Sequence, residues 1–412
     1  MKILYVCHRF PFPPRRGGKI RPFNMIRHLH ASHEVVVAAA SRSTDEAEEG
    51  AGLAAHCAAF DTAVVRAPLQ AARMIARLPT RMPSSIGWFH SSRLARRIRR
   101  RLATEHFDLV FVHCSSVAHY VEHVSGIPKI LDFGDMDSQK WLEYARVKPL
   151  PLRPGYWLEG HKMMAEEMRL ARRFDLCTAT TRAEWATLES YATAKATDWF
   201  PNGVDSAYFA PAGETYDADL VSFVGRMDYY PNQQCMIEFC ETVWPRVRAR
   251  RPGARLAIVG ADPSAAIRRL AALPGVSVTG SVPDVRPYLR RSALTVAPLR
   301  IARGTQNKIL EAMALGIPVV ASRLAAGGVD AVPGEHLLTA DTPDEQAAAI
   351  ASVLEQPEER ARLSQAGRAR MLSHHAWDRS MLRLDAIIER CVAEHRPRTE
   401  RVASTPRAAP QA

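Results

Sequence analysis

Short apolar runs alternate along this chain with stretches of helical periodicity. One series of such runs lies at 2–7, 34–40, 107–113, 129–132 and 175–180, and a second at 219–225, 255–260, 276–279, 294–298 and 317–322. Buried strands that alternate with helices are typical of parallel sheets covered by helices. The pattern therefore predicts an α/β fold with two Rossmann-like lobes.

A turn-rich segment, FPNGVD, separates the two series, because Gly, Pro and Asn favour turns. We place an N-terminal lobe at residues 1–203 and a C-terminal lobe at 204–376. Residues 396–412 hold almost no large apolar side chains, which predicts a disordered tail. Ligands of such sheets bind beyond the carboxyl ends of the strands, so we expect the site in a cleft between the lobes.

The chain length of 412 residues and the apolar fraction of 47% suit two globular domains. The seven cysteines are scattered without a C-x-x-C pair, which favours reduced thiols over disulfides or zinc. The first apolar run is too short for a signal peptide, and no run approaches the ~20 residues of a membrane-spanning helix. We therefore expect a soluble, cytoplasmic protein.

The net charge of +12 is concentrated in one segment, because residues 66–106 contain ten arginines and a single acid. Within it, Leu94, Ile98 and Leu102 form an apolar stripe on a predicted helix. A solvated basic face, contact with an anionic membrane surface and nucleic-acid binding are the three interpretations. The last lacks interleaved aromatic residues. We expect no nucleic acid, and propose membrane contact through 66–101 for testing.

The segment RGTQNKILEAMALGIPVVAS, residues 303–322, is predicted to form a loop, a short helix and a buried strand. Gly304 and Thr305 open the helix, Asn307 is its expected cap, and Gly316 its stop. A polar loop that feeds a helix N-terminus presents unpaired backbone N–H groups, which suit phosphate.

On this helix, Lys308 and Glu311 lie three residues apart and share one face. A cation for phosphate beside a carboxylate for sugar hydroxyls is what a nucleotide-sugar site needs. An exposed ion pair on an amphipathic helix is the alternative interpretation.

Polar residues also follow other predicted strands. Arg226 follows the strand at 219–225, where an arginine either binds phosphate oxygens with two prongs or serves structure alone. Gly17 and Gly18 follow the first strand and let the backbone approach a ligand, unless the loop is only a surface turn. Four cations surround these glycines: Arg15, Arg16, Lys19 and Arg21.

Three carboxylates, Asp132, Asp135 and Asp137, lie at and after the end of the strand at 129–132, and His113 ends the strand before it. They are candidates for a metal site, for binding acceptor hydroxyls or for general-base catalysis. No octahedral set of partners is evident, so we expect no metal. A lone histidine such as His113 is more often structural than catalytic.

Together these segments resemble the GT-B-fold, family-4-type glycosyltransferases, and more closely those associated with bacterial PEP-CTERM/exosortase exopolysaccharide systems. The matching pieces are HRFPFPPRRGGKIRPFN, LDFGDMDSQKW, FPNGVDSAYF, VGRMDYYPN, GSVPDVRPYL and APLRIARGTQNKILEAMALGIPVV. The resemblance implies transfer of a sugar from a nucleotide-diphosphate sugar to a glycan or lipid-linked acceptor, usually with retention. It implies no metal and no cofactor, the donor being a co-substrate. It also implies a last helix, at about 377–395, that packs back on the first lobe.

The resemblance also assigns roles by matching position, with the donor mainly on the second lobe. Glu311 would hold the ribose hydroxyls, with Arg226 and Lys308 on the diphosphate. Gly17 and Gly18 would approach a phosphate from the first lobe.

The chain departs from the family pattern at three places. Arg303 replaces the first of two glutamates eight residues apart, and joins Gly304 and Thr305 in the expected donor site. The lysine after the Gly-Arg pair is missing, so Lys308 and Arg303 are expected to supply its charge. A first-lobe loop that commonly carries a histidine reads DFGD instead. The catalytic candidates are Asp132, Asp135 and His113.

The leading hypothesis is a glycosyltransferase of the hexosyltransferase class in exopolysaccharide biosynthesis. A nucleotide-sugar 2-epimerase of the same fold would need a distinct set of acids and histidines, which is not found. A non-catalytic nucleotide-sugar-binding subunit stays open, because Arg303 stands where the family has a glutamate.

Overall fold

The computed structural model describes residues 1–14, 17–65 and 67–395, which form two compact units. Unit 1 contains Met1–Ala179, Glu184–Phe200 and the chain from Met381 onward, and unit 2 contains Thr180–Ala183 and Pro201–Ser380. The tail predicted at 396–412 lies outside the described residues, as do Arg15, Arg16 and Arg66. No described helix is both long and apolar enough to cross a membrane.

Unit 1 is built on seven strands: β1 (Lys2–Cys7), β2 (Glu34–Ser41), β3 (Ala59–Val64), β4 (Leu109–His113), β5 (Lys129–Gly134), β6 (Leu176–Ala179) and β7 (Thr197–Trp199). They form one parallel sheet in the order β3-β2-β1-β4-β5-β6-β7. Continuous apolar runs such as the VVVAAA of β2 are buried along their length, as a sheet covered on both faces requires.

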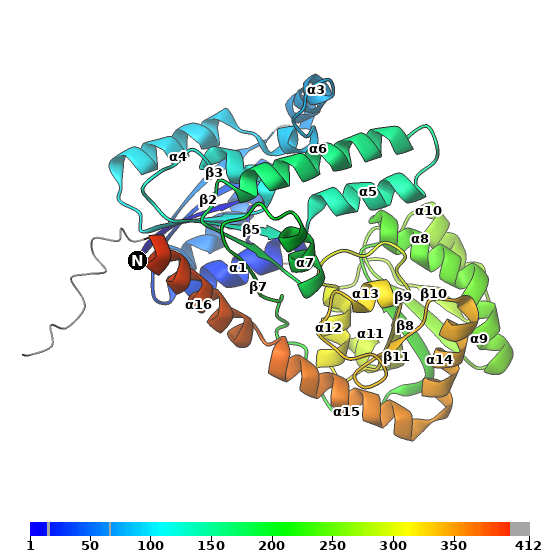
Figure 1. The fold of residues 1–412 in the computed structure, drawn as a ribbon. Coiled ribbons are helices and arrows are strands. Elements are labelled where there is room, and N and C mark those ends of the chain that lie inside the picture. Colours follow the sequence, from blue (N-terminus) through cyan, green and yellow to red (C-terminus); the bar gives the residue numbers. More distant parts are fainter. Residues whose placement is uncertain (15–16, 66, 396–412) are drawn as a thin grey trace, which may run out of the picture. The chain divides into compact units, whose positions relative to one another are not determined.

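The α-helices that lie wholly or mainly in unit 1 are α1 (Gly17–His30), α2 (Thr44–Glu49), α3 (Ala67–Arg77), α4 (Ser92–Thr104), α5 (Asp137–Val147), α6 (Arg153–Ala171), α7 (Arg182–Ser190) and α16 (Trp377–His395). Short 3₁₀ turns are η1 (Gly50–Ala55), η2 (Ser85–Phe89) and η3 (Ser115–Tyr120). Figure 1 shows α1 and α16 on one face of the unit 1 sheet and α4 and α6 on the other. The His28 imidazole of α1 lies 2.9 Å from the Asp385 carboxylate of α16, which ties the last helix to this unit.

Unit 2 repeats the architecture with β8 (Asp217–Val224), β9 (Arg255–Val259), β10 (Val276–Val278), β11 (Ser292–Ala297), β12 (Val319–Ala321) and β13 (Leu338–Thr339). The parallel sheet has the order β10-β9-β8-β11-β12-β13. Its helices are α8 (Tyr230–Glu238), α9 (Trp244–Arg250), α10 (Ala265–Arg269), α11 (Arg286–Arg290), α12 (Asn307–Ala314), α13 (Arg323–Ala326), α14 (Pro343–Glu355) and α15 (Pro357–His374). A π-helical turn, η4 (Phe239–Val243), and a 3₁₀ turn, η5 (Leu270–Ala272), complete it.

The predicted fold class of two parallel α/β sheets is confirmed, and each of the ten predicted strands is present, β1 with the predicted bounds and the other nine with shifted ends. Three strands were not predicted: β3, β7 and β13. All three lie at sheet edges, where one side needs no neighbouring strand, and β3 carries the polar Asp61 and Thr62. Such strands lack the continuous apolar run that marks a central strand.

The apolar stripe of α4 faces the core of unit 1. Leu94 and Ile98 are 0% and 1% exposed and pack among the buried residues beneath the helix. Arg97 donates to the Thr62 carbonyl oxygen, and Arg101 pairs with Asp61. The stripe therefore cannot be the apolar side of a membrane-binding helix, which corrects the interpretation of the pattern in α4.

Candidate functional site

Each sheet has one point at which the strand order reverses, between β8 and β11 in unit 2 and between β1 and β4 in unit 1. Doubly wound folds bind ligands beyond the carboxyl ends of the strands at such points. Most of the predicted donor-site residues lie beside the first point, and the predicted catalytic residues beside the second.

The N-terminus of α12, in unit 2, carries no side-chain cap. Gln306 precedes the helix without a capping hydrogen bond, and Asn307 is its first helical residue, so the prediction that Asn307 caps it is wrong. Both the Thr305 hydroxyl and Asn307 Oδ1 are buried without a hydrogen-bond partner in the described part of the chain. Uncapped N–H groups and unused side-chain oxygens together offer a polar surface suited to an anionic, hydroxyl-rich ligand.

Two glycines fix the loop that leads into α12. Gly304 has a φ of 60°, a left-handed conformation that residues with a side chain rarely adopt. A Cβ atom at Gly328 would lie 2.1 Å from the Gly304 carbonyl oxygen, so only glycine fits there. Arg303 begins this loop as a half-buried residue, and its carbonyl oxygen accepts a hydrogen bond from Gln306 Nε2 at 3.1 Å.

Lys308 is held by neighbours from the end of β8 and the start of α8. Its Nζ donates to Asn232 Oδ1 at 2.7 Å and lies 4.4 Å from the centroid of the Phe223 ring. Asn232 Nδ2 donates in turn to the Arg226 carbonyl oxygen at 2.8 Å. A Cβ atom at Gly225 would lie 2.8 Å from Asn232 Nδ2 and 3.2 Å from Lys308 Nζ. Sequence analysis assigned Asn232 no role, although the DYYPN segment that contains it carried part of the resemblance.

The Glu311 carboxylate forms neither a hydrogen bond nor an ion pair with any residue of 1–14, 17–65 and 67–395, Lys308 included. The alternative interpretation, an exposed ion pair, is therefore wrong. Burial raises the pKa of Glu311 to about 7, against the opposing effect of Lys308. Burial also lowers the pKa of Lys308 to about 8. Both groups thus change charge near neutrality and remain available to a ligand.

Arg226 lies directly after β8, as predicted, but its guanidinium group already has partners. Nε donates to Asp228 at 3.0 Å, and Nη2 donates to Asp228 at 2.6 Å and to Asp262 at 2.7 Å. The side chain is 40% exposed. A phosphate at Arg226 would therefore have to compete with two carboxylates.

In unit 1, Asp132 is the centre of a buried network at the end of β5. It is 0% exposed and accepts hydrogen bonds from Arg21 Nε at 2.9 Å, Arg21 Nη2 at 3.1 Å and Thr178 Oγ1 at 2.9 Å. Burial alone would raise the pKa of Asp132, but the Arg21 charge and the hydrogen bond from His113 outweigh it and hold that pKa well below its ordinary value. Because substrate cannot reach Asp132, its geometry suits positioning rather than direct catalysis.

His113 ends β4, and its Nδ1 lies 2.7 Å from Asp132 Oδ2. An ionised carboxylate only accepts hydrogen bonds, so His113 donates through Nδ1 and leaves Nε2 as its other ring nitrogen. The ring of His8, just after β1, lies 5.6 Å from that of His113 between centroids. Burial lowers the pKa of His8 well below its ordinary value, so this ring is neutral. Sequence analysis missed His8, although HRF directly follows the first strand.

Four cations were predicted to surround Gly17 and Gly18, but Lys19 and Arg21, the two that the structure describes, are both paired with carboxylates. Lys19 pairs with Glu46 at 2.6 Å, and Arg21 belongs to the buried network described above. Gly17 and Gly18 are the exposed first residues of α1, so the groups that this helix start offers to an anion are its backbone N–H groups.

Asp135 lies half-buried between β5 and α5, and Asp137 opens α5 and pairs with Lys140 at 3.2 Å. Asp132, Asp135 and Asp137 therefore do not converge on one point. Across the three described stretches of the chain, no group of His, Cys, Asp or Glu side chains is arranged to hold a metal ion.

Two family models match the sequence. The model for glycosyltransferase family 4 matches residues 16–208, and the model for glycosyl transferases group 1 matches residues 218–356. No curated protein gives a significant match to the chain.

Solved structures share this fold at low sequence identity. Sucrose-phosphate synthase from Thermosynechococcus elongatus is 16% identical, with 96% of this chain and 100% of that one covered and a TM-score of 0.69. Anabaena HepE in complex with UDP-glucose is 14% identical, with 94% and 99% covered and a TM-score of 0.67. A glycosyltransferase from Rickettsia africae is 12% identical, with 95% and 98% covered and a TM-score of 0.64. Family models that cover both units, together with this shared fold, place the chain among the GT-B glycosyltransferases of the group 1 and family 4 type.

Proposed function

We propose that this glycosyltransferase moves a hexose from a nucleotide-diphosphate sugar to a glycan or lipid-linked acceptor, with retention, in exopolysaccharide biosynthesis of the PEP-CTERM/exosortase-associated type. The two family models support the transferase class. The solved HepE structure contains UDP-glucose, which makes uridine nucleotides the first donors to try.

One observation carries the proposal: the start of α12 gathers unused polar groups of the kinds that a nucleotide sugar requires. The first-turn N–H groups and the Lys308 ammonium group suit the diphosphate. Glu311, which has no partner of its own in the described residues, suits the ribose hydroxyls. Thr305 and Asn307 leave two buried oxygens for further donors from the ligand.

We assign supporting roles to the remaining donor-site residues. Asp228 and Asp262 balance the charge of Arg226 while the site is empty. Arg226 binds the diphosphate by exchanging one of these two carboxylates for phosphate oxygens. Arg303 adds positive charge beside Gly304, and Gly17 and Gly18 let the start of α1 approach a phosphate. Basic side chains and helix dipoles then neutralise the leaving diphosphate.

In unit 1 we propose His113 as the group that contacts the reacting sugar or the acceptor hydroxyl, through Nε2. Asp132 is its positioning residue, since the charged carboxylate fixes the ring and its tautomer. Asp135 stays a candidate for binding acceptor hydroxyls.

The test is a panel of uridine, guanosine and adenosine diphosphate sugars, each incubated with the protein with and without glycan acceptors. Release of nucleoside diphosphate together with a glycosylated product of retained anomeric configuration supports the proposal. Binding without any release would favour the non-catalytic subunit. Conversion of the donor into its 2-epimer without transfer would favour the epimerase.

A further inference from the structure

Exposed apolar side chains are concentrated in two short segments of unit 1. Of the nineteen large hydrophobic residues that are exposed in the described part of the chain, nine lie within 67–82 and 144–158. They are Leu69, Ile75, Leu78, Met82, Val147, Leu150, Leu152, Trp157 and Leu158. Leu150 is 75% exposed, Ile75 66% and Trp157 55%, so more than half of the surface of each residue faces solvent. Isolated exposed leucines are ordinary, but such a concentration marks an interaction surface.

The same two segments are basic and contain no acid. Residues 67–82, which form α3 and the turn after it, carry Arg73, Arg77 and Arg81 and neither Asp nor Glu. Residues 144–158, which connect α5 to α6, carry three further cations and no acid: Arg146, Lys148 and Arg153. Apolar residues interspersed with cations suit a surface that is both apolar and anionic.

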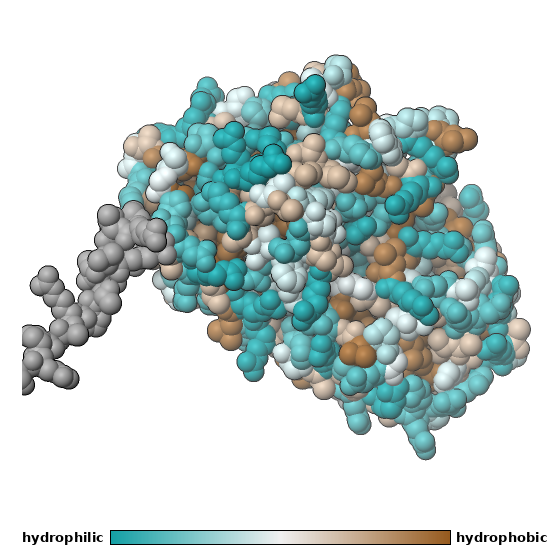
Figure 2. Space-filling view, in the orientation of Figure 1, coloured by the Kyte–Doolittle hydropathy of each residue, from teal (hydrophilic) through white to brown (hydrophobic). Residues whose placement is uncertain are grey.

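Contacts between α6 and the chain after α3 join the two segments into one surface. Lys162 Nζ donates to the Leu78 carbonyl oxygen at 2.7 Å. The buried Glu159 carboxylate accepts from the backbone N–H groups of Ser84 and Ser85 at 3.0 and 2.8 Å. Glu159 thereby holds the two segments together. Figure 2 shows hydrophobic residues among hydrophilic ones along this edge of unit 1.

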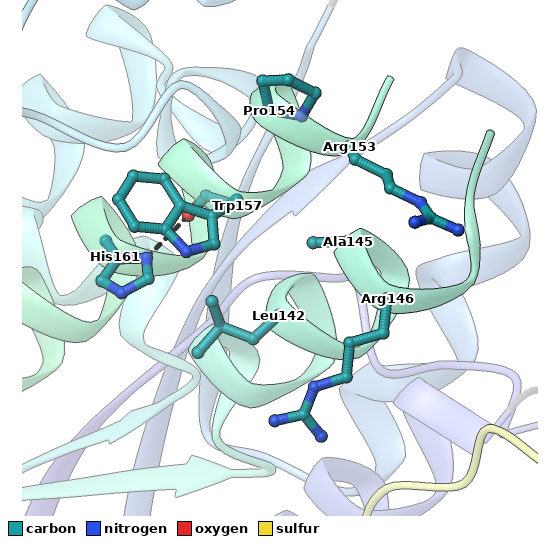
Figure 3. A pocket seen from close by; sticks show the side chains of 7 residues that line it. All are labelled: Leu142, Ala145, Arg146, Arg153, Pro154, Trp157 and His161. Carbon is teal, nitrogen blue, oxygen red and sulfur yellow. Dashed lines mark hydrogen bonds between the residues drawn. The ribbon is translucent and has the colours of Figure 1, made fainter. Parts of the chain in front are cut away.

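An open groove of about 520 Å³ lies between α5 and α6 on this surface (Figure 3). Arg146 lines it from α5 and Arg153 from α6, and neither arginine forms an ion pair with a described residue. Arg153 Nε donates to the Lys148 carbonyl oxygen at 2.6 Å, which steadies it. The other lining residues are Leu142, Ala145, Pro154, Trp157 and His161.

We propose that α3 and the α5–α6 connection form the face by which this protein lies on an anionic phospholipid bilayer, with Arg146 and Arg153 each facing lipid phosphates. Leu150, Leu152 and Trp157 enter the interfacial layer, where an indole and short apolar side chains are favoured. The groove between the helices then receives the upper part of a lipid chain against Leu142 and Pro154.

This assignment moves the membrane contact away from α4. The stripe of α4 is buried in the core, so its exposed Arg96, Arg99 and Arg100 have no apolar side chains to insert beside them. Membrane contact would bring the protein to a lipid-linked acceptor, and this role of the contact rests on the proposed function. The contact itself is measured without any sugar donor.

The experiment is flotation of the full chain with vesicles of phosphatidylcholine alone and of phosphatidylcholine with phosphatidylglycerol, at low and high salt. Wild type is expected to bind the anionic vesicles, less so as salt rises. Two variants test the face: Leu150→Ser with Leu152→Ser and Trp157→Ser, and Arg146→Glu with Arg153→Glu. Each is expected to bind anionic vesicles at least about tenfold more weakly, because the anchors or the cations are lost.

Two matched controls carry equivalent changes elsewhere. Leu273→Ser with Leu372→Ser and Leu382→Ser removes three other exposed leucines, and Arg96→Glu with Arg99→Glu and Arg100→Glu reverses charges on α4. Both are expected to bind vesicles within about twofold of wild type, apart from the long-range charge effect that salt removes. Nucleoside diphosphate binding, measured in the same variants, should be unchanged and separates this proposal from the proposed function.

Brominated phospholipids supply a second readout, since they quench tryptophans only within the bilayer. Quenching in wild type that disappears in Trp157→Phe supports insertion of this side chain. Equal vesicle binding by wild type and both face variants would overturn the proposal. So would saturation of the groove by inorganic phosphate at matched ionic strength without vesicles, or self-association through this face in sedimentation velocity.

Discussion

Lys308 and Glu311 lie on one face of α12, but their surroundings differ. Asn232 and Phe223 hold the Lys308 ammonium group, whereas the Glu311 carboxylate is left without a partner in the described chain. An acceptor that is half-buried and unused costs stability, which is the usual signature of a group kept for a ligand.

Replacing Glu311 by Ala is expected to reduce transfer by at least about 100-fold, because the donor loses the contact that orients its ribose. The protein should be no less stable. Since the pKa of Glu311 is raised from 4.5 to about 7, stability in wild type falls as the pH rises through this interval, and the variant lacks that fall. Steady-state kinetics and urea unfolding measure the two effects.

Glu355→Ala, at the exposed end of α14, is the matched control and should leave both properties unchanged. Wild-type turnover in Glu311→Ala would remove Glu311 from the donor site.

Lys308 makes donor binding depend on pH. Its pKa in the free protein is lowered to about 8, so the side chain is charged at neutral pH and loses its charge above about pH 8. The affinity for a nucleoside diphosphate should then fall by up to about tenfold per pH unit, while Lys308→Arg stays charged and shows no such fall. Calorimetric titrations at a series of pH values measure this, and an affinity that stays flat above about pH 8 in wild type would refute it.

The chemistry of single residues was predicted where it depends on neighbours in sequence, as for Lys308 and Glu311. It was not predicted where it depends on distant partners. Arg21 was expected to add positive charge around Gly17 and Gly18, but it pairs with Asp132, 111 positions away. The same pairing buries Asp132 in a network, which is why we propose it as a positioning residue, and nothing in its local sequence carries that information.

At the scale of elements, the donor site depends on close approach between the β8–α8 turn and α12. Gly225 directly follows β8 and lies against Asn232 and Lys308, and a Cβ atom at Gly260 would lie 1.8 Å from the Gly225 carbonyl oxygen. Glycines after the adjacent strands β8 and β9 thus bring two turns together, beside the point between β8 and β11 where the strand order reverses.

Substitution of Gly225 by Ala should therefore displace Asn232 and Lys308. We expect a loss of about 1–3 kcal/mol of stability, as for overpacking in a tight site, together with weaker binding of nucleoside diphosphate. Denaturant unfolding and calorimetry measure both. Gly155→Ala, where the new Cβ meets nothing within 4 Å, is the control. Full diphosphate affinity in Gly225→Ala would show that Lys308 does not need this packing.

The start and end of α12 illustrate what a sequence pattern reveals about an element. Gly316 was predicted to end the helix, and its φ of 75° confirms this, because the requirement is local. The cap at Asn307 was predicted from residue type alone and is absent. The Oδ1 atom of Asn307, which was expected to cap α12, instead has no hydrogen-bond partner among the described residues, and only the structure reveals this.

At the scale of the whole molecule, each unit repeats a doubly wound parallel sheet, and the unit boundaries are crossed by α7 and α16. The alternation of strands and helices sufficed to predict this architecture, because central strands are apolar throughout. It did not reveal the exposed face of α3 and the α5–α6 connection. A concentration of arginines attracted attention to α4, whereas exposure of apolar residues depends on how the helices pack.

The central claim is that the start of α12 and the end of β8 bind the diphosphate of a nucleotide-sugar donor. Calorimetry tests it most directly, with the diphosphates of uridine, guanosine and adenosine compared with the corresponding uncharged nucleosides. Wild type should bind at least one diphosphate. Lys308→Ala and Arg226→Ala should each weaken that diphosphate at least about tenfold more than its nucleoside. Equal losses for diphosphate and nucleoside, or no diphosphate binding by folded wild type, would contradict the account.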